Sequence, residues 1–379
     1  MLEWKLIRLG DICITNKNSY SSKDNWKFVN YLDTGSLTEN KITELQYINI
    51  ETDKIPSRAR RKVIKNSILY STVRPNQLHY GIIKEPVDNL LVSTGFTVID
   101  VDINKAIPEF VYYLLTQNNT TEQLQAIAEQ SVSTYPSIKP SDIENLEFKL
   151  PNLIIQNKIV SILDTIDSKI CQNEKINNNL EQQADALYQT FFSPKSGTQG
   201  KIVTLDEYCS IFTGKKNANA SVNGGKYKFF TCAPEALQID SYIFDGNAII
   251  VSGNGAYTGR TRFYSGKFDL YQRTYACTLL DNVNLDFIFP LYWFVKLELS
   301  KKIMGGTRGS AIPYIVMNDL AKFEFIYNEE MFANYTPLFK SLTEAIQANE
   351  SESENLAQIR DSLLPKLMSG ELDVSDIEL

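Results

Sequence analysis

The chain has 379 residues, of which 43% are hydrophobic, so it is long enough for two or three domains with packed cores. No apolar run approaches the roughly 18 residues of a membrane span, and the N-terminal stretch MLEWKLIRLGDI has no signal-peptide core. We therefore expect a soluble, cytoplasmic protein with no membrane contact. A single histidine and five widely spaced cysteines without a CxxC pair argue against a disulfide framework, a zinc site and most histidine-based catalysis.

The net charge of −7 is concentrated at the C-terminal end of the chain. Residues 331–379 contain 3 Lys or Arg against 9 Asp or Glu, whereas residues 1–150 contain 17 against 18 and residues 201–330 contain 14 against 13. The low overall isoelectric point therefore does not exclude binding of nucleic acid by the rest of the chain.

Taken in order, the sequence blocks of the first half recur in the second half. The clearest pairs are RLGDICITNKN (8–18) with TLDEYCSIFTGKKN (204–217), NSILYSTVRPNQLHYGI (66–82) with GNAIIVSGNGAYTGRTRF (246–263), STGFTVIDVDINKAIPEFVYYLLT (93–116) with QRTYACTLLDNVNLDFIFPLYWFVK (272–296), and TYPSIKPSDIENLEF (134–148) with AIPYIVMNDLAKFEF (311–325). The preserved order indicates an internal duplication. Because the offset between the halves shrinks from 196 to 177, we expect about 19 extra residues in the first half, between residues 35 and 62.

A basic tract is the sharpest local signal in the first repeat. Residues 54–84 contain eight Lys or Arg and no Asp or Glu. Loops that mix Arg, Lys, Asn, Gln and Tyr supply phosphate anchors and donors to base edges. The candidate DNA contacts here are Arg58, Arg60, Arg61, Lys62, Arg74, His79 and Tyr80. A solvated basic face without a partner is the alternative interpretation.

A long amphipathic helix is predicted at the end of the first repeat. Apolar residues recur in steps of three and four at Ile155, Ile159, Ile162, Ile166 and Ile170, and again at Leu180, Ala184, Leu187 and Phe191. A helix from about 156 to 192 would be about 55 Å long, which is more than one small domain can cover. We expect it to pair with a second helix of the same kind.

The second repeat begins after a linker rich in Pro, Gly and Ser at 191–201. Its basic residues are more scattered and lie mainly in Gly- and Asn-rich loops, so a solvated basic face competes more strongly here. The candidate DNA contacts of this repeat are Lys215, Lys216, Arg260, Arg262 and Arg308.

The last segment repeats the helical pattern, with Leu338, Leu342, Ile346, Asn349, Leu356, Ile359 and Leu363 on one face and Pro365 bending or ending the helix. The order globule, helix, globule, helix predicts two helices that run antiparallel, with one globule at each end and a pseudo-twofold axis. The fold class is then α+β, with two similar α/β recognition domains joined by two long antiparallel coiled-coil helices. We expect domains at 1–150 and 196–330, and helices at 151–195 and 331–379.

Catalytic signatures are absent from the sequence. It contains no GxxxxGK[ST] loop, no GxGxxG after a strand and no (D/N)PP(Y/F) tetrapeptide. We therefore expect a chain that is not an enzyme and has no cofactor or metal of its own. Four functions stay open at this point: a DNA-specificity subunit of a larger complex, a stand-alone DNA-binding protein or decoy, a coiled-coil scaffold with two protein-binding heads, and an enzyme without a recognisable motif.

The layout resembles the specificity (S) subunits of Type I restriction–modification systems. LEFKLPNLIIQNKIVSILDTID, with Pro151, Gln156, Ile159 and Leu163, is similar to the strand-to-helix junction of that family, and LLPKLMSGELDVSDIEL is similar to its closing phrase. Two departures are visible. Ile155 stands where the family usually has Glu, and IYNEEMFANYTPLF in the second repeat lacks the Pro…Gln phrase.

This resemblance implies a non-catalytic subunit that binds double-stranded DNA. Each recognition domain would read one half of a bipartite, asymmetric site, and the helices would set the spacer. Two modification (M) subunits, which bind S-adenosylmethionine, would dock on the chain to methylate adenine. Restriction (R) subunits, which use ATP and magnesium, could join them for cleavage.

Overall fold

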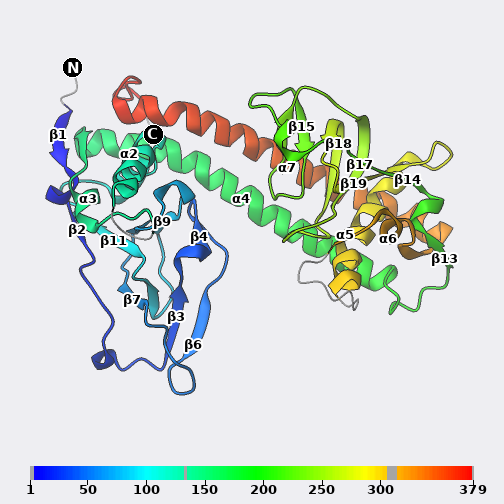
Figure 1. Cartoon of the computed structure of the whole chain (residues 1–379), viewed down its shortest axis with the longest axis horizontal. Coiled ribbons are helices and arrows are strands. Elements are labelled where there is room, and N and C mark those ends of the chain that lie inside the picture. The colour runs from blue at the N-terminus through cyan, green and yellow to red at the C-terminus, as the bar shows by residue number, and fades with distance from the viewer. Residues whose placement is uncertain (1–3, 132–134, 305–313, 378–379) are drawn as a thin grey trace. The chain divides into compact units, whose positions relative to one another are not determined.

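The computed structural model describes residues 4–131, 135–304 and 314–377. The chain forms two compact units, and each contains one repeat together with parts of both long helices (Figure 1). Unit 1 comprises residues 1–170 and 354–379, and unit 2 comprises residues 171–353. Unit 1 is therefore assembled from the two ends of the sequence.

Unit 1 contains two four-stranded sheets and three short helices. One sheet has the order β2 (Cys13–Thr15), β11 (Phe96–Val101), β8 (Ser67–Ser71), β9 (Tyr80–Ile83), and the other the order β6 (Gln46–Asn49), β3 (Phe28–Leu32), β10 (Leu90–Ser93), β7 (Ala59–Lys62). Strand β1 (Lys5–Arg8) pairs with β12 (Glu147–Leu150), and β4 (Leu37–Thr38) pairs with β5 (Lys41–Ile42). The helices are α1 (Pro108–Leu115), α2 (Asn118–Glu129) and α3 (Pro140–Glu144).

Strand β8 is buried along its whole length because it contributes to two cores. Successive side chains of a strand point to opposite faces. Ile68 and Tyr70 therefore belong to the cluster that includes Phe110 of α1, whereas Leu69 belongs to a second cluster with Phe96. The uninterrupted apolar run of this strand is the pattern expected for burial on both faces.

Unit 2 is built on a single six-stranded sheet. Its order is β14 (Cys209–Thr213), β19 (Thr274–Leu279), β17 (Phe244–Ser252), β18 (Thr261–Leu270), β15 (Tyr227–Phe230), β16 (Leu237–Ile239). Strand β13 (Lys201–Thr204) pairs with β20 (Glu324–Tyr327), and the helices are α5 (Ile288–Met304) and α6 (Met317–Ala321). Trp293 of α5 is fully buried and donates its indole N–H to Thr343 Oγ1 at 2.9 Å.

The two units repeat the same local hydrogen bonds, which confirms the internal duplication. The amide of Leu9 donates to the carbonyl of Leu146 at 2.9 Å, and the amide of Leu205 donates to that of Phe323 at 3.0 Å. Asp142 and Asp319 cap α3 and α6 in the same way, by accepting from the amides of Lys139 at 2.7 Å and Val316 at 2.9 Å. Within the region where extra residues were expected, unit 1 contains the β4–β5 hairpin.

The two long helices pair with each other, as predicted. They are α4 (Leu153–Phe191) and α7 (Glu329–Ser369). In unit 2, Asn173 donates to Glu352 Oε2 at 2.8 Å, and Asn349 donates to Asn177 Oδ1 at 2.7 Å. The later residue of α4, Asn177, bonds to the earlier residue of α7, Asn349, so these segments of the two helices run antiparallel.

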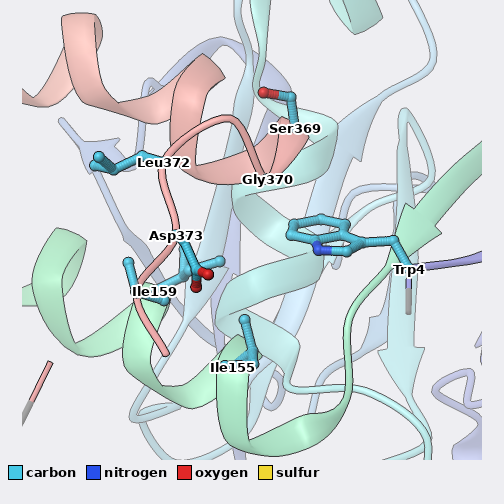
Figure 2. A pocket seen from close by; sticks show the side chains of 8 residues that line it. Trp4, Ile155, Ile159, Ser369, Gly370, Leu372 and Asp373 are labelled. Carbon is cyan, nitrogen blue, oxygen red and sulfur yellow. The ribbon is translucent and has the colours of Figure 1, made fainter. Parts of the chain in front are cut away.

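Pro365 does not end α7, which continues to Ser369. Leu367 and Met368, in the turn after the proline, are buried in the core of unit 1, so packing offsets the hydrogen bond that proline cannot make. The helix ends at Gly370, whose φ of +77° is favourable for glycine. A Cβ at this position would lie 2.9 Å from the Trp4 ring. Figure 2 shows Trp4 and Gly370 among the residues that line a pocket with Ile155 and Ile159 at the start of α4.

In unit 1, a polar network joins α1, α4 and α7. Asp167 accepts from Arg360 Nη1 at 3.0 Å and from the hydroxyl of Tyr113 at 2.7 Å. Burial by itself would lower the pKa of Arg360, but the hydrogen bonds to Asp167 and Asp361 raise it overall. The network therefore favours the charged guanidinium.

We predict that Asp167→Ala lowers the free energy of unfolding of unit 1 by about 1–3 kcal/mol, because it leaves the Tyr113 hydroxyl without its acceptor and Arg360 with Asp361 alone. Urea denaturation of the full chain measures the effect. Asp164→Ala is the matched control on the same helix, because Asp164 pairs with Lys84 at an exposed site and should cost no more than about 1 kcal/mol. Equal losses from the two variants would contradict the assignment.

Candidate nucleic-acid interface

Strand β7 and the residue before it contain four of the basic candidates of unit 1, Arg58, Arg60, Arg61 and Lys62. Arg58 and Arg60 are exposed, whereas Ala59 between them is fully buried. Thr94 donates its amide to the carbonyl of Arg58 at 2.9 Å, and Tyr20 donates to that of Arg60 at 2.8 Å. The backbone is thus fixed on both sides while both side chains are exposed, and Arg60 Nε donates to the carbonyl of Ser57 at 3.4 Å.

Lys62 and Arg61 are more engaged with the protein than the sequence suggested. Lys62 forms an ion pair with Asp24, and its ammonium group lies 5.1 Å from the centre of the Trp26 ring. The hydrogen bond from Lys62 lowers the pKa of Asp24. Arg61 is half-buried, and its Nε has no hydrogen-bond partner within the described part of the chain.

The loop between β8 and β9 presents Arg74. Its backbone has φ 47° and ψ 72°, a left-handed conformation that is uncommon for a residue other than glycine. The amide of Arg74 donates to the carbonyl of Pro136 at 3.0 Å, and its guanidinium lies 5.2 Å from the centre of the Tyr135 ring. Arg74 is exposed despite these contacts.

The β4–β5 hairpin covers the other two candidates of this unit. His79 Nδ1 lies 2.7 Å from the carbonyl oxygen of Leu37 and 3.0 Å from Thr38 Oγ1. A carbonyl can only accept, so this nitrogen carries the proton. Tyr80 is 7% exposed and its ring stacks on Tyr70, so its side chain belongs to the core and is not available to DNA in this structure.

In unit 2, Lys215 and Lys216 follow β14 and differ in their surroundings. Lys215 is exposed. Lys216 forms an ion pair of 2.9 Å with Asp269, a buried carboxylate that also accepts from Ser241 at 2.8 Å. Lys216 therefore neutralises a buried charge, and only Lys215 of the pair extends freely into solvent.

Three arginines gather where the β17–β18 and β18–β19 loops meet. Arg260 is exposed, with its guanidinium 5.1 Å from the centre of the Tyr257 ring, and Arg273 is also exposed. Arg262 is half-buried and donates to the carbonyls of Ala233, at 2.7 Å, and Pro234. Burial and the charge of Arg260 lower the pKa of Arg262. Arg308 lies outside the described residues.

The same arrangement of backbone hydrogen bonds, called the clamp below, holds the basic loop of each unit. This loop connects β8 to β9 in unit 1 and β17 to β18 in unit 2. Ile138 donates its amide to Thr72 at 2.8 Å, and Ile315 donates to Gly253 at 2.8 Å. Thr72 in turn donates to Gly95 at 2.8 Å, and Gly253 donates to Arg273 at 2.9 Å. The donors Ile138 and Ile315 belong to the repeated segments TYPSIKPSDIENLEF and AIPYIVMNDLAKFEF, so the repetition of these segments reflects a repeated support for the loop.

Two tyrosines beside these arginines were not predicted from the sequence. Tyr135 contacts Arg74 and Tyr257 contacts Arg260, and both rings are exposed. Such aromatic faces attract guanidinium groups. The only sequence signal for Tyr135 was its position inside the repeated segment.

Among the described residues, no group of three or more His, Cys, Asp or Glu is placed to hold a metal ion, and no helix there is long and apolar enough to cross a membrane.

Comparison with known proteins identifies the family. The family described as the Type I restriction modification DNA specificity domain matches residues 1–182 and 199–327. The chain belongs to this family. The two matched ranges coincide with the two sequence repeats, which agrees with the duplication and with the resemblance noted from the junction and C-terminal motifs.

Relatives of this family match different parts of the chain. The HindI specificity subunit of Haemophilus influenzae is 33% identical over 59% of this chain and 48% of its own length. The EcoDI specificity subunit of Escherichia coli is 36% identical over 45% of this chain and 38% of its own length. The chain thus spans about half the length of these relatives or less.

Two further matches extend over almost the whole chain. The MjaIX specificity subunit of Methanocaldococcus jannaschii is 23% identical over 98% of this chain and 94% of its own length. The crystal structure of a Type I restriction–modification S subunit from M. genitalium covers 99% of this chain and 97% of its own, with a TM-score of 0.61 and 16% identity. At that identity the similarity concerns the fold, which is α+β with two similar units and long helices.

The clamp can be tested at Gly253, where a Cβ would lie 2.4 Å from the carbonyl oxygen of Arg273. We predict that Gly253→Ala lowers the free energy of unfolding of unit 2 by about 1–3 kcal/mol, because the added methyl forces the loop away from its support. Gly35→Ala is the control, since nothing lies within 4 Å of a Cβ there. A loss no larger than that of the control, measured by urea denaturation, would show that the clamp tolerates displacement.

Proposed function

We propose that the protein is the DNA sequence-specificity subunit of a Type I restriction–modification complex and carries out no chemistry itself. The observation that carries the proposal is the match of the family to both repeats, residues 1–182 and 199–327. The relatives named above are themselves specificity subunits of Type I restriction enzymes. The exposed arginines on equivalent loops of the two units supply the positive charge that DNA binding needs.

Each unit would read one half of a bipartite, asymmetric site in double-stranded DNA. The proposed contacts of unit 1 are Arg58, Arg60, Arg61, Arg74 and His79, with Lys62 supporting them through Asp24 and Trp26. Those of unit 2 are Lys215, Arg260 and Arg262, with Lys216 neutralising Asp269, and with Arg308 as a candidate outside the described residues. Tyr80 is left out because its ring is buried.

The paired helices α4 and α7 would set the spacer between the half-sites and offer surface to partner proteins. We propose that two M subunits dock there and methylate adenine with S-adenosylmethionine, and that R subunits add cleavage driven by ATP and magnesium in the cytoplasm. The proposed division is 1–150 and 196–330 for recognition, with 151–195 and 331–379 for the helices. The acidic 331–379 segment, with 3 basic and 9 acidic residues, would repel DNA from the spacer.

Methyl transfer tests the role directly. The chain and a methyltransferase subunit of the same Type I system are purified separately and mixed with unmodified genomic DNA and radiolabelled S-adenosylmethionine. We expect label in DNA only when both proteins are present. Label from the methyltransferase alone would remove the need for a specificity subunit, and label from this chain alone would identify an enzyme. No label from the mixture, with both proteins folded, would contradict the proposal.

We predict that the double variant Arg58→Ala, Arg60→Ala lowers the salt dependence of binding to double-stranded DNA. Each lost phosphate contact reduces the slope of log K against log salt by about 0.9, so the double variant should lose about 1.8. Fluorescence anisotropy at several salt concentrations measures the slope. Lys149→Ala, an exposed change on β12, is the control. An unchanged slope in the double variant would exclude both arginines as phosphate contacts.

A further inference from the structure

Within the proposed function, we propose that the loop Thr72–His79 is the base-reading element of unit 1. In this proposal Arg74, Asn76 and Gln77 contact base edges in the major groove, while Arg58 and Arg60 anchor the phosphate backbone. The inference rests on the proposed function and adds a division of roles among the residues of one unit. It follows from the rigidity of the loop, the exposure of its polar tips and its counterpart in unit 2.

The loop is held in an unusual conformation. Arg74 and Leu78 have φ values of 47° and 57°, although neither is glycine. Arg74 also precedes Pro75, and the residue before a proline normally adopts extended backbone angles and avoids the helical region. Strained residues persist only where the surrounding structure fixes them, and they concentrate at functional sites. The single helical turn Pro75–Gln77 between the two strained residues is therefore a fixed platform.

Hydrogen bonds from three separate elements fix the platform. The strand-like bridge between Val73 and Ser137 ties its start to the repeated segment. The amide of Asn76 donates to Gln125 Oε1 of α2 at 3.2 Å, and the amide of Glu39 donates to the carbonyl of Leu78 at 2.9 Å. A loop that is already ordered loses little conformational entropy on binding.

The side chains of Arg74, Asn76 and Gln77 are exposed. In the part of the chain that the structure describes, the Asn76 and Gln77 side chains form no hydrogen bond, and the side chain of Arg74 makes only the ring contact with Tyr135. The chemistry matches base recognition, because Arg donates two hydrogen bonds to guanine and Asn or Gln pairs with the donor and acceptor of adenine. By contrast Lys62, at the end of β7, is already paired with Asp24.

Unit 2 carries the corresponding loop between β17 and β18 on the same clamp but with different side chains. Its bridge joins Asn254 to Tyr314, as Val73 joins Ser137 in unit 1. The exposed residues of that loop are Ala256, Tyr257 and Arg260, of which the last two carry polar groups. A repeated support that presents different polar groups is the arrangement expected for two units that read different half-sites.

Single variants test the division of roles. Asn76→Ala, Gln77→Ala and Arg74→Lys are each combined with the methyltransferase subunit, and methylated adenines are counted on a library of random DNA. Asn76→Ala keeps the backbone hydrogen bond to Gln125, and Arg74→Lys keeps the charge but loses the two-pronged donor geometry. We expect each to relax discrimination roughly 5- to 150-fold at one or two positions of a single half-site. The other half-site should stay unchanged, which also reports that the complex is folded.

Arg60→Ala is the matched control, because a lost phosphate contact should weaken methylation of all sequences alike and leave the motif intact. If all three loop variants behave like this control, with an unchanged motif, the loop does not read bases and the inference is overturned. If the wild-type chain yields no motif with its methyltransferase, the proposed function itself fails. The wild-type and variant results therefore separate the two failures.

Discussion

One pair of backbone hydrogen bonds in each unit determines where its basic loop lies. In unit 1 the amide of Ile138 donates to the carbonyl of Thr72, whose amide donates to the carbonyl of Gly95. In unit 2 the amide of Ile315 donates to the carbonyl of Gly253, whose amide donates to the carbonyl of Arg273. Backbone bonds of this kind do not depend on the side chains of the loop. The loop sequence can therefore differ between the units while its position is kept, which a protein needs if two similar domains are to recognise unlike partners.

The charged residues divide into those that stabilise the protein and those left for a ligand. Lys62 and Lys216 each form an ion pair within their own unit, with Asp24 and Asp269. Arg58, Arg60, Arg74 and Arg260 are exposed on strands or loops whose backbones are fixed. Within each unit, a ligand with repeated negative charge would meet such exposed side chains first, at little entropic cost to the loops.

Periodicity and repetition predicted most of the architecture. The steps of three and four from Ile155 to Phe191 indicated α4, and the paired blocks indicated the duplication, because both depend on local sequence order. The surroundings of individual side chains could not be predicted in this way. The ring of Tyr80 is buried against Tyr70 and Tyr112, and Lys216 meets Asp269 on a distant strand. Of the two outcomes expected at Pro365, an end of α7 was wrong, because the helix continues to Ser369 and the turn after the proline packs in the core of unit 1.

In the proposed function, two similar units on one chain give a methyltransferase a two-part DNA target. The most direct test is to express the chain with a methyltransferase subunit of the same Type I system in cells that lack adenine methylation, and to map methylated adenines by long-read sequencing against each protein alone. We expect a bipartite motif, with two specified halves and a fixed unspecified spacer, that appears only when both proteins are present. A single uninterrupted motif, or the same motif from the methyltransferase alone, would contradict it.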